Sequence, residues 1–181
     1  MTRYVALLRG VNVGGAKRVP MAELRSILES LGYSGVRTLL NSGNAIFEGT
    51  RLSAAGHADR IRIAIAARLN VEVPVIVKSA KNMVEIETGN TLAPIATDPS
   101  RLLVAFTSDG NALAELVALS TLVCPPEQLQ LGEHAAYLWC PDGILKSKAG
   151  EALLGKFGRA ATTRNWATVL KINALLREDA A

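Results

Sequence analysis

The stretch YVALLRGVNVGGAKRVP, residues 4–20, sets the fold of the N-terminal half of the chain. Its first five residues are apolar and predict a buried strand. Glycines and cations follow as far as Pro20, which suits the first position of a helix because its missing N–H would have no partner there. The stretch therefore predicts a strand, a glycine-rich loop and a helix in succession.

The elements expected after this stretch continue in a recognisable order. Apolar residues at helical or strand spacing, with turn residues between them, define each element. We expect strands at 4–8, 36–40, 45–47 and 73–77, helices at 21–31 and from Ser53 to residue 69, and a short extra helix at 81–87. The order β-α-β-β-α-β is the split-βαβ, or ferredoxin-like, pattern.

A similar order begins again in the second half of the chain. We expect strands at 101–106, 128–131 and 135–140, helices at 111–119 and 149–157, and a last helix from Arg164 to Arg177 capped by Thr163. The predicted fold is α+β, with two ferredoxin-like-related (split βαβ) subdomains and a C-terminal helix. The subdomains are predicted at 1–90 and 101–181, and residues 91–100 form a connector.

Composition and charge limit the class of protein. Apolar residues make up 49% and charged residues 20%, as in ordinary globular proteins. The net charge of +4 favours encounters with phosphate-bearing partners without fixing any specificity. Cys124 and Cys140 have no metal-ligand spacing, and neither a signal peptide nor a membrane span is recognisable. We expect a cytoplasmic protein that has no membrane partner, metal or cofactor.

Two polar segments are predicted to meet at one edge of the first sheet. In the split pattern the first two strands are parallel and the third lies between them. The loop 9–19 and the turn 41–44 both follow the C-terminal ends of these parallel strands, about 10 Å apart at two strand spacings. The sequence therefore predicts one pocket rim from two distant segments.

The loop resembles a phosphate-binding loop only in part. Gly10 and Gly15 have the P-loop separation, but Ala16 precedes Lys17, and Arg18 stands where serine or threonine would bind magnesium. Backbone N–H groups of a glycine-rich loop can still bind an anion. The alternative is a connection whose glycines serve turn geometry, and residues 41–44 have the same alternative as a plain hairpin turn.

The stretch TTRNW, residues 162–166, is the second unusual feature. At the start of the expected helix Arg164 meets the positive end of the helix dipole, which is unfavourable without an anion nearby. That anion is either a carboxylate of this chain or a bound phosphate or carboxylate. Lys146 and Lys148 either face the same anion or lie on a solvated surface.

These features define a candidate ligand-binding site. Arginine and lysine would neutralise the ligand's charge, while asparagine and serine would orient it. The predicted residues are Arg9, Asn12, Gly14, Gly15, Lys17, Asn41, Ser42 and Asn44, with Lys148, Arg164 and Asn165 contributed by the C-terminal region. His134 in a turn is a weak catalytic candidate, and the spacing of Glu85 and Glu87 puts them on different helix faces. No reaction is assigned.

The chain resembles the mainly bacterial family known as domain of unknown function 1697. The resemblance rests on YVALLRGVNVGG (4–15), NSGN (41–44), DPSRL (98–102), PDGI (141–144) and TTRNW (162–166), and departs at Leu145, where we expect glycine. It implies an α+β fold of two ferredoxin-like-related subdomains and implies no activity.

Binding of a small anionic ligand is thus the leading functional hypothesis. A nucleic-acid-binding module that uses the same cations is the first alternative, although ferredoxin-like sheets bind RNA through exposed aromatic residues, and here the sheet offers only Tyr4 and Phe47. A purely structural or interaction protein is the second alternative. It predicts that Arg164 is buried against a carboxylate of the same chain.

Overall fold

The computed structural model describes residues 1–15, 17–50, 52–155 and 157–178. Contacts divide the chain into two compact units, Met1–Lys81 with Ile172–Ala181, and Asn82–Lys171. Each unit contains one four-stranded antiparallel sheet. Within the described ranges no helix has the length and apolar character needed to cross a membrane.

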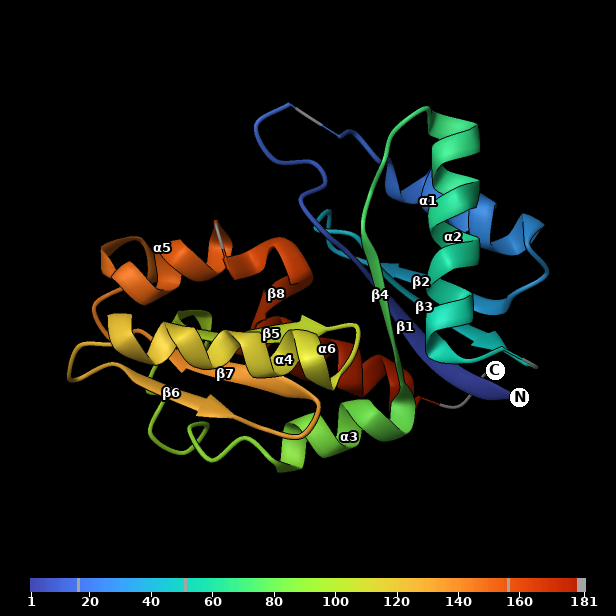
Figure 1. Cartoon of the computed structure of the whole chain (residues 1–181). Helices are drawn as coiled ribbons and strands as arrows, with labels where there is room; N and C mark the ends of the chain where they lie inside the picture. The colour runs from blue at the N-terminus through green and yellow to red at the C-terminus, as the bar shows by residue number, and fades with distance from the viewer. Residues whose placement is uncertain (16, 51, 156, 179–181) are drawn as a thin grey trace. The chain divides into compact units, whose positions relative to one another are not determined.

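The first unit has the predicted ferredoxin-like topology. Its strands are β1 (Thr2–Leu8), β2 (Ser34–Leu39), β3 (Asn44–Gly49) and β4 (Val75–Ser79), and its helices are α1 (Met21–Ser30) and α2 (Ala54–Leu69). The sheet order is β2-β3-β1-β4 with antiparallel neighbours, so β1 and β2 are parallel with β3 between them. Figure 1 shows α1 and α2 on the same face of this sheet.

Alternation along the strands builds the core under the two helices. Ala6 and Leu8 of β1 and Phe47 of β3 point to the helix-covered face, where they pack with buried residues of both helices. The helical partners are Leu24, Ile27, Leu28, Ile61 and Ile65. The predicted cap of α2 is confirmed, because the Ser53 hydroxyl accepts a 3.1 Å hydrogen bond from the Gly56 N–H.

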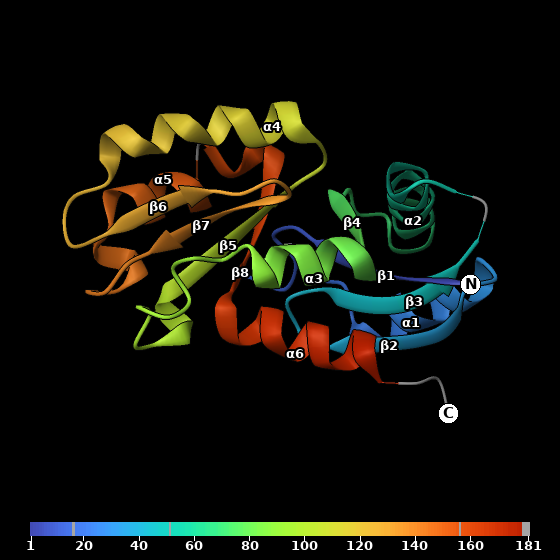
Figure 2. The same ribbon diagram turned by 90° about the horizontal axis from the view of Figure 1, so that it is seen from below.

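The second unit repeats the same order of elements. Its strands are β5 (Leu102–Thr107), β6 (Gln128–Leu131), β7 (Ala135–Trp139) and β8 (Ala161–Asn165); its helices are α3 (Ala80–Thr88, which begins in the first unit), α4 (Gly110–Glu115) and α5 (Lys148–Leu154). The sheet order β6-β7-β5-β8 matches that of the first sheet, position for position. Helices α4 and α5 cover one face (Figure 2). On the other face α3 contacts Tyr137, whose hydroxyl donates to the Ile86 carbonyl over 2.7 Å.

The end of the chain differs from the expectation. The predicted helix from Arg164 is wrong in its first part, because Ala161–Asn165 form strand β8, paired with β5, and α6 covers only Trp166–Arg177. The β-branched pair Thr162 and Thr163 favours a strand. The cap is Asn165 rather than Thr163, since the Asn165 side chain accepts a 2.9 Å hydrogen bond from the Thr168 N–H. With β8 the second unit has its fourth strand, and the predicted fold class is confirmed.

A buried histidine lies in the core of the first unit. His57, in the first turns of α2, is fully buried against the rings of Tyr4, Tyr33 and Phe47. Its Nδ1 shares a 2.8 Å hydrogen bond with the Tyr33 hydroxyl, and no described residue bonds to its Nε2. Burial, and to a smaller extent the Arg60 charge, lowers the pKa of His57 below its ordinary value of 6.5.

We therefore expect acid to destabilise the first unit through His57. In the unfolded chain the His57 imidazole binds a proton near pH 6.5, whereas in the folded protein it stays neutral to lower pH. The contribution of His57 to the free energy of unfolding is therefore lost as pH falls below about 6.5, by up to about 1.4 kcal/mol per pH unit. Urea unfolding at pH 7, 6 and 5 should show a shallower pH dependence for His57→Gln than for the wild type. Equal slopes in His57→Gln and the wild type would contradict this assignment.

Candidate functional site

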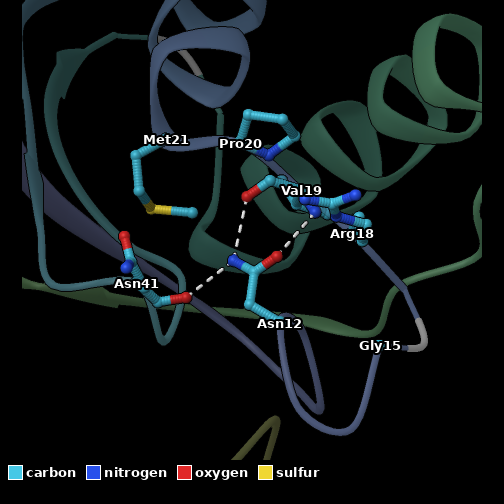
Figure 3. Close-up of a pocket in the computed structure, with 7 residues that line it drawn as sticks. All are labelled: Asn12, Gly15, Arg18, Val19, Pro20, Met21 and Asn41. Atoms are coloured by element: carbon cyan, nitrogen blue, oxygen red, sulfur yellow. Dashed lines mark hydrogen bonds between the residues drawn. The ribbon is translucent and has the colours of Figure 1, made fainter.

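A pocket opens in the first unit where the β1–α1 loop meets the β2–β3 turn. Its volume is about 340 Å³, which is within the range of small-molecule sites. We call it the loop pocket. Its lining residues are Asn12, Gly15, Arg18, Val19, Pro20, Met21 and Asn41 (Figure 3). The two segments meet at one sheet edge, as the topology predicts.

The Asn12 side chain ties the two segments together. Its amide nitrogen donates to the Val19 carbonyl over 3.0 Å and to the Asn41 carbonyl over 2.7 Å, and its oxygen accepts from the Val19 N–H over 2.9 Å. The dashed lines of Figure 3 show these three bonds converging on Asn12. Both amide hydrogens are thus used within the protein, and the side chain holds the loop in one conformation.

The loop backbone is unusually rich in left-handed conformations. Gly10, Asn12, Gly14, Gly15 and Lys17 have φ between 49° and 79°. Glycine and asparagine accept this region at little cost, whereas lysine does so rarely. The loop is also closed by a 3.2 Å hydrogen bond from the Asn12 N–H to the Lys17 carbonyl. Glycine at three of these positions supplies the left-handed turn geometry, and of the five residues Asn12 and Gly15 line the pocket.

Close packing fixes the β2–β3 turn against the start of the loop. The Gly43 carbonyl accepts a 2.8 Å hydrogen bond from the Leu8 N–H. A Cβ on Gly43 would lie 2.6 Å from the Leu8 Cβ and 2.8 Å from the Val11 Cγ2. The Asn44 amide donates to the Leu39 carbonyl and to the Ser42 hydroxyl, at 2.8 and 3.0 Å. The side chains of Ser42 and Asn44 therefore form hydrogen bonds within the turn.

Two cations of the loop are exposed. Lys17 and Arg18 lie at the surface, and neither forms an ion pair with any residue that the structure describes. Arg18 lines the pocket. Arg9 is half-buried, and its backbone N–H donates to the Pro74 carbonyl over 3.0 Å. Of the loop's cations, Arg18 is the one that lines the pocket.

Helix α1 begins at the pocket without a side-chain cap. Pro20 is its N-cap and has no side-chain oxygen to accept from the first-turn N–H groups. The first backbone bond of the helix runs from the Leu24 N–H to the Pro20 carbonyl at 3.0 Å. The positive end of the helix dipole therefore adds to the charge of Arg18 at this site.

Not every residue predicted for the site lines the pocket. Asn12, Gly15 and Asn41 do, whereas Arg9, Gly14, Lys17, Ser42 and Asn44 lie in the same two segments outside the lining. The sequence prediction omitted Arg18, Val19, Pro20 and Met21. Arg18 could have been included from the sequence, because it directly follows the predicted site residue Lys17 and is also a cation. Pro20 and Met21 were interpreted only as the start of the helix.

The remaining predicted residues belong to the second unit. Lys148 is exposed at the first position of α5, and Asn165 caps α6. Arg164 is buried in β8, with 7% of its surface exposed, and donates to the Thr162 hydroxyl over 3.0 Å and to the Thr163 carbonyl over 2.8 Å. Burial lowers the pKa of Arg164 to about 10, so it remains charged at neutral pH. The expected position in a first helical turn is wrong for Arg164, and the dipole argument for an anion there no longer applies.

His134 has a carboxylate partner in the second unit. Its Nε2 lies 2.9 Å from Glu85 Oε2, and the Asn82 amide donates to the same Glu85 oxygen over 3.2 Å. This cluster joins α3 to the β6–β7 turn. Cys140 is buried, which raises the pKa of its thiol. Among the described residues no group of three or more His, Cys, Asp or Glu is arranged to hold a metal ion.

The double ferredoxin-like fold and the loop pocket can now be set beside known proteins. The chain belongs to the family described as "Protein of unknown function (DUF1697)", whose model matches residues 1–137 and so includes the whole loop pocket. The solved structure of the conserved bacterial protein SP0830 from Streptococcus pneumoniae is similar, with 30% sequence identity and a TM-score of 0.80, over 97% of this chain and 99% of that one. No curated protein matches the sequence significantly.

We expect Gly43→Ala to destabilise the protein by about 2–4 kcal/mol, because the left-handed φ of 79° and the overlap with Leu8 and Val11 both oppose a Cβ. Gly14→Ala is the matched control: its φ of 59° is also left-handed, but no atom lies within 4 Å of the added Cβ, so about 1 kcal/mol is expected. Urea unfolding measures both. Equal losses would show that the packing of the turn contributes nothing.

Asn12→Asp should lower the free energy of unfolding by about 1–2 kcal/mol, because two backbone carbonyls lose their donor and face a carboxylate instead. Asn41→Asp introduces the same charge on a pocket side chain for which no hydrogen bond is found among the described residues, so a change within about 0.5 kcal/mol is expected. Denaturant unfolding of both variants distinguishes the roles. An unchanged free energy of unfolding in Asn12→Asp would contradict the role of the Asn12 side chain in holding the loop.

Proposed function

We propose that the loop pocket binds a small ligand carrying a phosphate or carboxylate group. The observation that supports this most is Arg18, an exposed guanidinium that lines a pocket of about 340 Å³ and has no ion-pair partner among the described residues. A planar guanidinium can grip a phosphate or carboxylate with two parallel hydrogen bonds. Lys17 next to it adds positive charge at the rim.

Preorganisation supports the same proposal. The three hydrogen bonds of Asn12 and the packing of Gly43 hold the loop and the turn before any ligand arrives. A rigid site loses less conformational entropy on binding than a mobile one. The site requires only the first unit; contributions from Lys148, Arg164 and Asn165 remain a prediction on which it does not depend.

The first unit gives little support to nucleic-acid binding. Ferredoxin-like domains that bind RNA stack bases on aromatic residues of the exposed sheet face. Here Phe47 is fully buried and Tyr4 packs against the same core, on the face covered by α1 and α2. A small ligand therefore fits the loop pocket better than a nucleic-acid strand does.

The proposal includes a cytoplasmic setting and no reaction. Cys124 and Cys140 are both free thiols, which agrees with a reducing compartment. The names of the family and of the Streptococcus pneumoniae protein assign no activity to either.

Binding of inorganic phosphate tests the proposal. Titration followed by amide chemical shifts should perturb residues of the loop pocket, and Arg18→Met should weaken the affinity at least roughly tenfold, because a charge-assisted hydrogen bond contributes about 1.5–3 kcal/mol. Arg25→Met removes the same charge from an exposed position on α1 that does not line the pocket, and should bind phosphate as the wild type does.

Salt dependence and stability complete this test. Affinity for a pocketed small ion should fall gently with added sodium chloride, whereas a strand with several phosphate contacts would lose affinity steeply. Both variants should unfold at nearly the wild-type temperature without phosphate. Equal phosphate affinity in Arg18→Met and Arg25→Met, or shifts only outside the loop pocket, would refute the site.

A further inference from the structure

The walls of the loop pocket differ in polarity. Arg18 and Asn41 supply its available polar side chains, since the Asn12 amide hydrogens are already bonded to backbone carbonyls. The uncapped N–H groups in the first turn of α1 add backbone donors beside Pro20 and Met21. Pro20 is exposed and Met21 half-buried, and both present apolar surface to the same space. Figure 3 shows the Pro20 ring and the Met21 thioether on the side of the pocket away from Asn12.

This distribution of groups restricts the ligand more than charge alone does. A polyhydroxylated ligand such as a sugar phosphate would place hydroxyl groups against Met21 and Pro20, where no described side chain can replace their hydrogen bonds to water. An apolar body would instead remove the Met21 and Pro20 surfaces from water. The two polar side chains suffice for one acid group and one further hydrogen bond, and the first-turn N–H groups of α1 favour the same acid group.

Met21 also favours a particular shape of apolar body. A thioether makes favourable contacts with aromatic rings and adapts to their edges. Proline offers a flat face of fixed geometry beside it. The volume of about 340 Å³ accommodates one compact ring system.

We infer that the loop pocket selects a compact aromatic acid, a planar apolar ring bearing a single phosphate or carboxylate, with the acid at Arg18 and the ring against Met21 and Pro20. This inference rests on the proposed function and adds the class of ligand. Arg18 supplies affinity for the acid group, Met21 and Pro20 supply the preference for the ring, and Asn41 is placed to orient a ring substituent.

Matched pairs of probes separate the ring from the charge. Methyl phosphate and phenyl phosphate carry the same headgroup, as do acetate and benzoate, and each is titrated into the full chain with amide shifts as the readout. We expect the aromatic member of at least one pair to bind at least roughly tenfold tighter, since burial of one ring removes enough apolar surface for such a gain. The pair with the larger gain identifies the acid group.

Variants then locate the preference. Met21→Gln should abolish the advantage of the aromatic member and leave its aliphatic partner unchanged, whereas Met21→Leu should keep most of it. Pro20→Ser gives an independent test, because serine caps a helix well and preserves the fold while removing the ring. Arg18→Met should weaken both members of a pair equally.

Each result has a definite meaning. Equal affinities within both pairs, or an aromatic advantage that survives both Met21→Gln and Pro20→Ser, would overturn the aromatic-acid inference and leave anion binding intact. If the wild type bound none of the four probes, methyl phosphate, phenyl phosphate, acetate and benzoate, the proposed function and this inference would both be overturned.

Discussion

Three hydrogen bonds of one side-chain amide hold the site together. Asn12 bonds to both backbone groups of Val19 and to the Asn41 carbonyl, so a single residue closes the loop on itself and fastens it to the next turn. Asparagine is suited to this position because it tolerates the left-handed φ of 59° and offers donors and an acceptor on a short stem. Without this constraint the cations would have no fixed relation to Met21 or Asn41.

The split-βαβ topology makes that constraint reachable. Strand β3 runs between the parallel pair β1 and β2, which brings the segments after both parallel strands to one edge. The absence of a side chain at Gly43 lets the turn approach Leu8 and Val11 closely. Backbone topology thus brings the two segments near each other, and the small turn residue lets them touch.

Periodicity in the sequence predicts most of the fold but less of the site. Strand β6 is found at the predicted residues, and Ser53 caps α2, because alternation and capping are local properties. Residues 161–165 were misread because Thr163 is both a good cap and a good strand residue, and pairing with β5 decides between them. The use of the Asn12 amide within the loop, the burial of Arg164 and the place of Met21 in a pocket wall all depend on long-range packing, which no local pattern reports.

The two units have the same strand order but differ in the connection between the first strand and the first helix. In the second unit, Ser108 and Asp109 alone connect β5 to α4, and the Asp109 carboxylate accepts a 2.9 Å hydrogen bond from the Ala112 N–H at the helix start. In the first unit residues 9–20 make the corresponding connection, and the helix starts at a proline. A fold that can close with two residues does not require the longer segment. One unit places its own carboxylate at the start of the helix, whereas the other places cations and a pocket at the corresponding position.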